Sequence, residues 1–390
     1  MPTLAPLTDT AMPWAQAHAT ARAAAGPLPA IRVPVAEAAG QILAGPIRAA
    51  VTAPGFDTAA MDGYAVAGPG PWQVVGRVLA GRPAHPRPLR PGDAVEIATG
   101  ARVPAGTGAV VPYEDCHRDG GTVSGARTAR THIRRAGEDA APGDLLVPAG
   151  RPVTAAAVAA AAQVGVEEVL VRPRPGVGLL ITGDEVVLRG RPGPGQVRDV
   201  FTPLVTAVTA RAGGEVQASR RIGDDPDLLR EAIDASPAAV LVVTGSSSAG
   251  AADHLRTVLH QRSATWHVDG VACRPGHPQT LARTPGGTWI VGLPGNPYAG
   301  LVAALTLLEP LLATLAGRRR QPLPVAPVTG EAATLPRAAR VVPVETGPDG
   351  ARIVPGARSA SLRAAATADA LAVLGPGWSP GGAAPLLHLP

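Results

Sequence analysis

The sequence contains no lysine, so all 35 of its basic side chains are arginine. This absence excludes phosphate-binding loops that end in Gly-Lys, Schiff-base and pyridoxal enzymes, and kinase-type sites, because each of these needs a lysine amine. Aromatic residues make up only 3% of the chain, and no basic stripe is interleaved with them. We therefore expect no nucleic-acid binding, although the formal charge is +5.

The chain is also poor in cysteine and in metal-ligand pairs. Cys116 and Cys273 form neither a Cys-x-x-Cys pair nor a disulfide pattern, which favours a reducing cytoplasm. None of the nine histidines is paired at metal-ligand spacing, so a structural zinc site is not expected. The alanine-rich run at 154–162 is too short to span a membrane, and no signal peptide is evident. These features predict a cytoplasmic protein without a membrane segment.

Three apolar runs between residues 174 and 320 each end in an unusual loop. GVGLLI precedes the Thr182 to Glu185 loop, AAVLVV precedes the loop at 244–250, and WIVGL precedes the loop at 294–297. Short β-branched runs that alternate with helical patterns indicate βαβ units and a mostly parallel sheet buried on both faces. Because the carboxyl ends of such strands meet at one edge, we expect the three loops to share a ligand-binding edge.

The helices between these runs carry start and stop signals. Thr202 and Asp225 each stand before a proline, which predicts two capped helix starts. Gly213 and Gly214 should end the first of these helices. The last helix, expected over 298–315, contains Pro310, which should kink it.

The 390 residues should divide into two to four domains. Short runs broken by glycine and proline at 46–140 predict a small β barrel or sandwich. Helices expected at 14–25, at 35–43 and after Thr154 flank it, so we expect it to be inserted into a helical domain made of two segments, 14–45 and 141–173. Proline-spaced β runs at 321–390 predict a separate C-terminal β domain. The predicted fold is a multidomain α/β protein with β domains, whose central three-layer α/β domain covers 174–320.

The first loop, Thr182-Gly183-Asp184-Glu185, places two consecutive acids at a strand end. Adjacent carboxylates suit Mg²⁺, a hard cation that binds one or two carboxylates together with substrate phosphates. The alternative is a helix N-cap with a favourable dipole interaction. Asp224 and Asp253 are likewise either plain helix caps or part of an acidic metal site.

The second loop, which runs from Thr244 and Gly245 to Gly250, precedes an expected helix at 251–261. Its small side chains and backbone N–H groups would suit an anion, and the alternative is a flexible turn. The pattern Ser246-x-Ser248-x-Gly250 also resembles the nucleophile-elbow motif Gly-x-Ser-x-Gly, but serine stands in place of the first glycine. A hydrolase that uses Ser248 with Asp269 and His277 would have the right chain order.

Two further turns are rigid. Proline at both ends fixes the backbone of Pro294-Gly295-Asn296-Pro297, so this loop could present N–H and carbonyl groups to a ligand, or serve as a simple turn. The turn from Arg274 to His277 carries an arginine that could pair with an anion in a bidentate manner.

Six ordered motifs together resemble one family, the MoeA family of molybdopterin molybdenumtransferases, which is related to the C-terminal region of gephyrin. The motifs are PGFDTAAMDGYAV at 54–66, IATGARVPAGTGAVVPYED at 97–115, RRAGEDAAPGDLLVPAG at 134–150, TGDE at 182–185, VVTGSSSAG at 242–250 and GLPGNP at 292–297. The resemblance extends from about Trp14 to the C-terminus, and the expected domain order agrees with it.

The resemblance implies that adenylated molybdopterin and molybdate are converted to molybdenum cofactor, with Mg²⁺-dependent release of AMP. It implies a homodimer whose site lies between subunits, an upstream adenylyltransferase and downstream molybdoenzymes. By position it assigns catalytic roles to Asp62, Thr99, Glu185, Asp224 and Asp253, with Mg²⁺ held by Glu185 and Asp253. Substrate binding is assigned to Thr182, Gly183, Asp184, Thr244, Gly245, Ser246, Ser248, Gly250, Arg274, His277, Pro294, Gly295, Asn296, Pro297 and Ser359.

Several positions depart from the family pattern. The family has lysine where Arg274 and His277 stand, Gly-Gly-Val-Ser-Val-Gly where this chain has Gly-Ser-Ser-Ser-Ala-Gly, and an asparagine near residues 199–201. Arginine can hold an oxyanion but is bulkier and forked. The alternative function is therefore a catalytically impaired paralogue that binds molybdopterin or its nucleotide as a carrier or scaffold.

Overall fold

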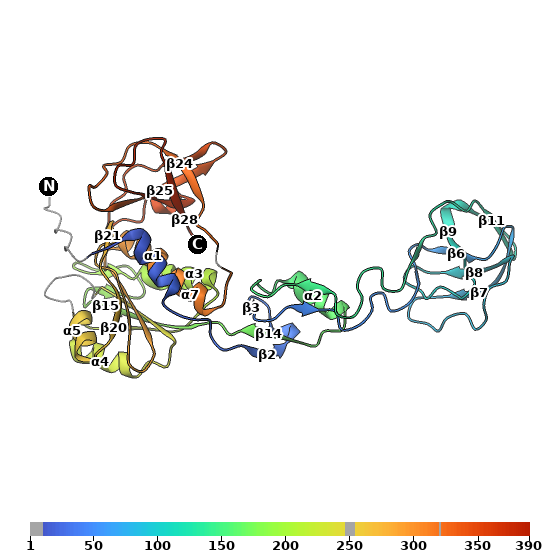
Figure 1. The fold of residues 1–390 in the computed structure, drawn as a ribbon, viewed down its shortest axis with the longest axis horizontal. Helices are drawn as coiled ribbons and strands as arrows, with labels where there is room; N and C mark the ends of the chain where they lie inside the picture. Colours follow the sequence, from blue (N-terminus) through green and yellow to red (C-terminus); the bar gives the residue numbers. More distant parts are fainter. Residues whose placement is uncertain (1–10, 246–253, 320) are drawn as a thin grey trace.

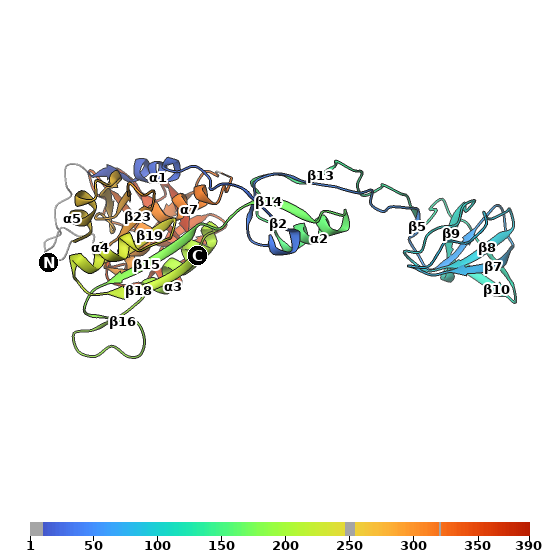
Figure 2. The ribbon, with the colours of Figure 1, turned by 90° about the horizontal axis from the view of Figure 1, so that it is seen from below.

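The computed structural model describes residues 11–245, 254–319 and 321–390. Figures 1 and 2 show an elongated molecule with a large α/β body at one end and a β domain at the other. A small region lies between them, and extended segments connect it to the distant β domain (Figure 2). This is a multidomain α/β architecture with β-rich domains.

The central sheet has six strands in the order β18-β15-β19-β23-β22-β20. The first four strands are parallel to their neighbours, and the last two are antiparallel. The mostly parallel sheet predicted from the apolar runs is therefore present. The bounds are β15 Gly176–Thr182, β18 Glu215–Ile222, β19 Val240–Thr244, β20 Thr265–Asp269, β22 Thr280–Arg283 and β23 Trp289–Leu293.

Helices cover both faces of this sheet. Successive strand residues point to opposite sides, so a continuous apolar strand presents apolar side chains on both faces. Leu179 and Ile181 belong to one buried cluster and Leu180 to another. The first cluster is covered by α1 Trp14–Ala23, α3 Phe201–Ala212, α6 Pro297–Ala303 and α7 Glu309–Leu315, and the second by α4 Pro226–Asp234 and α5 His254–Gln261. The domain thus has three layers.

One helix within the described ranges, Pro297–Leu315, is long and apolar enough to cross a membrane, but 89% of that window is buried inside the protein. It is the core helix of the α/β body. A π-helical segment, Ala304–Leu308, joins α6 to α7, and Pro310 is the second residue of α7. Since proline lacks an N–H, this change of helix type accommodates the residue expected to kink the helix. The Trp14 Nε1 donates a hydrogen bond to Thr306 Oγ1 in the same segment, at 3.0 Å.

Two of the predicted helix signals are confirmed and one is wrong. Asp225 caps α4 by accepting from the backbone N–H of Asp227 at 2.7 Å, and Gly213 ends α3 with a φ of +89°. The prediction that Thr202 caps α3 is wrong, because α3 begins at Phe201. Asp199 Oδ1 instead accepts from the N–H groups of Phe201 and Thr202. Thr202 therefore lies in the first turn of α3, and Asp199 supplies the acceptor for the N–H groups that have no partner within the helix.

The region formed by 14–45 and 141–173 was predicted to be helical, but much of it is β structure. Its only α-helix outside α1 is α2 Ala155–Gln163, which begins after Thr154 as predicted and is capped by the Thr154 hydroxyl. The segment expected as a helix at 35–43 holds a 3₁₀ turn, Val35–Glu37, and the strand β3. A three-stranded sheet fills the region, formed by β2 Ile31–Pro34, β14 Glu168–Arg172 and β3 Ile42–Leu43.

Helix α1 lies elsewhere because its small buried face, Ala17 and Ala21, fits against the core helix of the α/β body. In the small region, Pro34 and the left-handed Gly40 bracket the 3₁₀ turn and prevent a longer helix. The strand β4 Ile47–Arg48 pairs with β13 Leu145–Val147, so the two segments approach each other beside the extended connections.

The inserted β domain contains a six-stranded sheet with buried clusters on both faces. Its strands are β6 Gly63–Val66, β7 Trp72–Val78, β8 Asp93–Ile97, β9 Ala109–Pro112, β10 Cys116–Asp119 and β11 Thr122–Gly125. A 3₁₀ turn, Tyr113–Asp115, follows β9. At the end nearer the connections, β5 Thr58–Ala59 pairs with β12 Ile133–Arg134.

The C-terminal β region has strands at the predicted runs, and its sheet extends beyond that region. Its strands are β24 Val325–Thr329, β25 Ala339–Gly347, β26 Gly350–Ile353, β27 Ala370–Leu374 and β28 Ala383–His388, with a 3₁₀ turn at Ala365–Thr367. The sheet continues into the α/β body, because β21 Val271–Arg274 pairs with β25, and β1 Met12–Pro13 pairs with β21. The region has a buried cluster of its own, formed by residues between 328 and 386, but its sheet also includes β21 and β1.

Candidate functional site

The three strands that precede the predicted loops end at one edge of the central sheet. Neighbouring strands end in register there, with Ile181 beside Thr244 and Thr244 beside Leu293. The buried Thr182 hydroxyl donates to the carbonyl of Thr244, and the Gly245 N–H donates to the carbonyl of Leu293 at 3.1 Å. These bonds tie the three strand ends together at the edge where parallel sheets bind ligands.

Arg221, near the end of β18, holds the loop that carries the adjacent acids. Its guanidinium donates two hydrogen bonds to the carbonyl of Gly183, at 3.2 and 3.0 Å, and one to the carbonyl of Asp184 at 2.9 Å. The Arg221 Nη2 also lies 3.7 Å from Asp184 Oδ1. Sequence reasoning missed Arg221, and its only signal was an arginine at the end of a strand at this edge.

The loop does not lead into a helix. It is followed by β16 Val186–Val187, which pairs with β17 Val197–Arg198, and the intervening chain projects from the body (Figure 2). The alternative reading of 182–185 as a helix N-cap is therefore wrong. Gly183 has a φ of +126°, and a Cβ built there would lie 2.7 Å from Glu185 Oε2. Glycine at this position thus leaves room for the Glu185 carboxylate.

The acidic residues lie close together without forming a complete metal cage. Asp224 Oδ2 accepts from the backbone N–H of Asp184 at 3.4 Å. Among the described residues, no group of three or more His, Cys, Asp or Glu could hold a metal ion. Asp253, the second predicted Mg²⁺ ligand, lies outside the described residues, as do Ser246, Ser248 and Gly250.

The backbone of Ser359 reaches the loop formed by Pro294, Gly295, Asn296 and Pro297. Its carbonyl accepts from the N–H groups of Tyr298 at 3.0 Å and Ala299 at 3.3 Å. These are the first N–H groups of α6 after Pro297, which has none. The start of α6 is therefore already capped by the C-terminal β region.

The turn from Arg274 to His277 lies against the same helix. A Cβ at Gly276 would lie 3.4 Å from the carbonyl of Ala299 in α6. The Gln279 side chain donates to the carbonyl of Gly276 at 2.8 Å, and the N–H of Val271 donates to the carbonyl of His277 at 2.9 Å. The structure thus brings the half-buried Arg274 and His277 to the junction of the α/β body and the C-terminal sheet.

A Ser-His-Asp hydrolase does not fit the described part of this site. Asp269 forms an ion pair with Arg256, and the Nδ1 of His277 lies 2.9 Å from the carbonyl of Val271. In a catalytic triad a carboxylate would hold that nitrogen and fix the ring. Asp269 and His277 therefore do not form the carboxylate–imidazole pair that this reaction needs.

Asp62 and Thr99 are brought together, but far from the sheet edge. The N–H of Thr99 donates to Asp62 Oδ1 at 2.7 Å, and both residues are exposed on the inserted β domain. Figure 1 places that domain at the opposite end of the molecule from β15. Within one chain, the four predicted catalytic residues that the structure describes therefore form two separate groups, Asp62 with Thr99 and Glu185 with Asp224.

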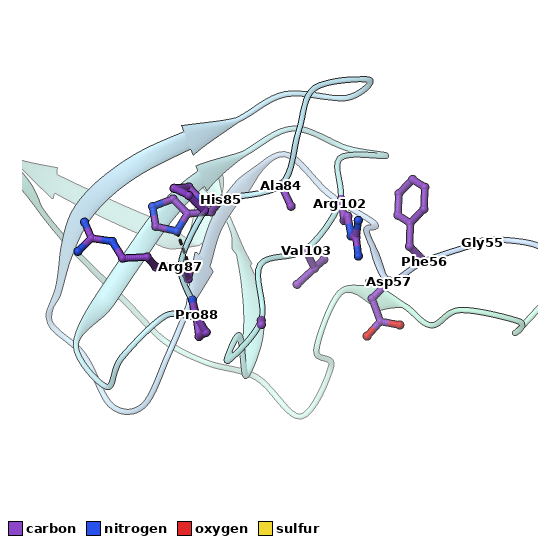
Figure 3. A pocket seen from close by; sticks show the side chains of 11 residues that line it. Gly55, Phe56, Asp57, Ala84, His85, Arg87, Pro88, Arg102 and Val103 are labelled. Atoms are coloured by element: carbon purple, nitrogen blue, oxygen red, sulfur yellow. Dashed lines mark hydrogen bonds between the residues drawn. The ribbon is translucent and has the colours of Figure 1, made fainter.

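A pocket in the inserted domain adds residues that sequence reasoning did not single out. It has a volume of about 560 Å³ and is lined by residues that include Phe56, His85, Arg87 and Arg102 (Figure 3). Phe56 lies within the motif at 54–66 and Arg102 within the motif at 97–115. The two motifs were the sequence signal for this pocket, but only Asp62 and Thr99 within them were predicted as site residues.

Known proteins match most of this chain. Residues 12–165 match the family described as MoeA N-terminal region (domain I and II), and residues 178–314 match a probable molybdopterin binding domain. Molybdopterin molybdenumtransferase 2 of Mycobacterium tuberculosis (strain ATCC 25618 / H37Rv) is 37% identical over 307 residues, covering 72% of this chain and 74% of the relative. The molybdopterin molybdenumtransferase of Synechococcus elongatus is 34% identical over 315 residues, covering 76% and 78%.

A solved structure extends the similarity to almost the whole chain. The molybdopterin biosynthesis MoeA protein from Pyrococcus horikosii superposes with a TM-score of 0.79 at 26% identity. The match covers 98% of this chain and 100% of that one. The similarity therefore includes the inserted β domain and the C-terminal β region.

Proposed function

The chain belongs to the MoeA family of molybdopterin molybdenumtransferases, which act in molybdenum cofactor biosynthesis, and we propose that it inserts molybdenum from molybdate into adenylated molybdopterin with release of AMP. The observation that carries this proposal is the shared sheet edge. There Arg221 fixes the acidic loop, and Arg274 lies at the neighbouring junction.

The charges of the described residues support this reaction. Both substrates are anions, and Arg274 supplies a cation that can bind an oxyanion in a bidentate manner. The hydrogen bonds from Arg221 to Gly183 and Asp184 hold the backbone on which Glu185 is placed. Groups that are fixed before substrate binds do not need to reorganise during the reaction.

The residues present fit Mg²⁺ as the cofactor. Magnesium prefers oxygen ligands and is usually bound by one or two carboxylates together with substrate phosphates. In our proposal Glu185 and Asp253 hold the ion, and Asp224, which accepts from the N–H of Asp184, steadies the loop. Bound Mg²⁺ would neutralise the charge of the phosphates.

The second group, Asp62 and Thr99, enters the proposal through a homodimer. Because the elongated shape separates this pair from the sheet edge of its own chain, we propose that it serves the site of a second copy (Figure 1). An adenylyltransferase would supply the substrate and molybdoenzymes would receive the product, in the cytoplasm.

The test measures AMP release from adenylated molybdopterin with Mg²⁺ and molybdate, and then tests the product on a molybdenum-free apoenzyme. We expect molybdate-dependent AMP release and reactivated apoenzyme from the wild-type chain, and loss of both in Glu185→Gln. Glu331→Gln, an exposed acid in the C-terminal region, is the matched control and should keep full activity. Tight nucleotide binding without turnover would instead identify a carrier, the alternative function.

A further inference from the structure

The pocket in the inserted β domain has the size and construction of a small-molecule site. Three segments line it, at 55–57, 84–88 and 102–105, and they enclose about 560 Å³ (Figure 3). Ligand sites in proteins commonly occupy about 300–1,000 Å³.

The pocket favours an anion. Its acidic lining residue, Asp57, is already neutralised, since its Oδ1 accepts from the N–H of Ala136 at 2.9 Å and its Oδ2 pairs with Arg135 at 2.5 Å. Figure 3 shows the Asp57 carboxylate turned away from Arg102. Arg87 and Arg102 are then left as excess positive charge among the lining residues.

The pocket also offers an aromatic surface. Phe56 lines the cavity and is 44% exposed, so its ring is accessible to a ligand. The Arg102 Cζ lies 5.8 Å from the centre of its ring. An exposed ring with a neighbouring guanidinium provides a stacking surface and a charge for a flat anionic ligand.

The walls of the pocket are continuous with the segments that hold Asp62 and Thr99. Arg102 forms a β-bridge with Thr58, and the N–H of Gly100 donates to the carbonyl of Ala59 at 2.8 Å. The same two segments therefore carry Phe56 and Arg102 on the pocket and, a few residues further along each, Asp62 and Thr99.

We propose that this pocket binds a flat heteroaromatic ring that carries a phosphate ester. The ring stacks on Phe56, and the phosphate pairs with Arg102. Both halves of adenylated molybdopterin have this chemistry, so the assignment of the ligand to that substrate rests on the proposed function. The pocket would orient one half of the substrate next to Asp62 and Thr99.

Calorimetric titration of the full chain with AMP tests this proposal, with adenosine, ribose 5-phosphate and a pterin phosphate as comparison probes. AMP or the pterin phosphate should bind more tightly than adenosine or ribose 5-phosphate, and whichever binds more tightly identifies the half that the pocket holds. Arg102→Gln should weaken binding about 10- to 100-fold, the effect of a lost charged hydrogen bond. Phe56→Leu should weaken it at least about fivefold through lost stacking.

Arg130→Gln, an exposed arginine of the same domain outside the pocket, is the matched control and should bind like the wild type. Binding that Arg102→Gln and Phe56→Leu leave unchanged, or the absence of binding by both ring phosphates, would overturn the pocket. Pocket-dependent binding in a chain that releases no AMP would refute only the proposed reaction.

Discussion

Alanine in place of Gly245 should destabilise the sheet edge by about 2–5 kcal/mol. Gly245 has a φ of +84°, and a left-handed backbone costs a residue with a Cβ about 1–2 kcal/mol. The new Cβ would also lie 2.8 Å from Thr182 Oγ1 and 3.1 Å from the carbonyl of Thr182. Crowding of this kind in a packed region costs about 1–3 kcal/mol.

Two other glycines separate these contributions. Gly381 has a φ of +87° and open space around its Cβ position, so Gly381→Ala should show the backbone cost alone, about 1–2 kcal/mol. Gly375 has open space and a φ outside the left-handed region, so Gly375→Ala should stay within about 0.5 kcal/mol of wild type. Placing Gly245→Ala on a Thr182→Ala background should remove most of the crowding and lower its cost.

Native-state hydrogen exchange of the amides in β15 and β19 is the suitable assay, because it reports the opening free energy of this domain in a multidomain chain. Gly245→Ala should reduce protection there more than Gly381→Ala reduces it in the C-terminal region. Equal losses of opening free energy in Gly245→Ala and Gly381→Ala would contradict this reasoning, as would a Gly245→Ala loss that Thr182→Ala does not reduce. Either result would show that the close approach of Gly245 to Thr182 does not require glycine.

Three further predictions concern other contacts. Arg221→Gln should lower molybdate-dependent AMP release about 10- to 100-fold while changing the melting temperature little, because it loosens the loop that places Glu185. The N–H of Ala136, together with Arg135, holds the pKa of Asp57 below its usual value. The stability that the ionised Asp57 carboxylate contributes is therefore present above about pH 4 and is lost as the pH falls through the lowered pKa. Thermal unfolding should show that Asp57→Asn lacks this part of the acid-side decline, and an unchanged pH profile would contradict the assignment. Thr306→Val should cost about 1–3 kcal/mol in denaturant unfolding, because it leaves the Nε1 of Trp14 buried without its acceptor, and Trp14→Phe in the same chain should make the threonine change nearly neutral.

The sequence by itself determined the features that depend on neighbouring residues. The apolar runs at 176–181 and 289–293 are strands of a mostly parallel sheet, since a buried strand needs a continuous apolar run. Asp225, Thr154 and Gly213 act as helix signals because each acts within three residues of its own position. The ordered motifs also identified the family.

Local patterns failed where proline and glycine interrupted an apolar stretch. The segment at 35–43 has apolar residues at helical spacing, yet it forms a 3₁₀ turn and a short strand that pairs with β14. Thr202 likewise had a good capping pattern, but Asp199 supplies the oxygen. In both cases a competing partner outside the short pattern decided the local structure.

Only the tertiary structure decided which residues far apart in the sequence meet, in the core and at the site. Trp14 bonds Thr306 across 292 positions, and the Ser359 carbonyl caps the helix that begins at Pro297. β21 pairs with β25 and so brings the Arg274 turn to the junction with the C-terminal sheet, whereas Asp62 and Thr99 lie at the other end of the chain's elongated shape. Such contacts satisfy polar groups and bury surfaces that no short stretch can complete alone, so they are fixed only when the whole chain has folded.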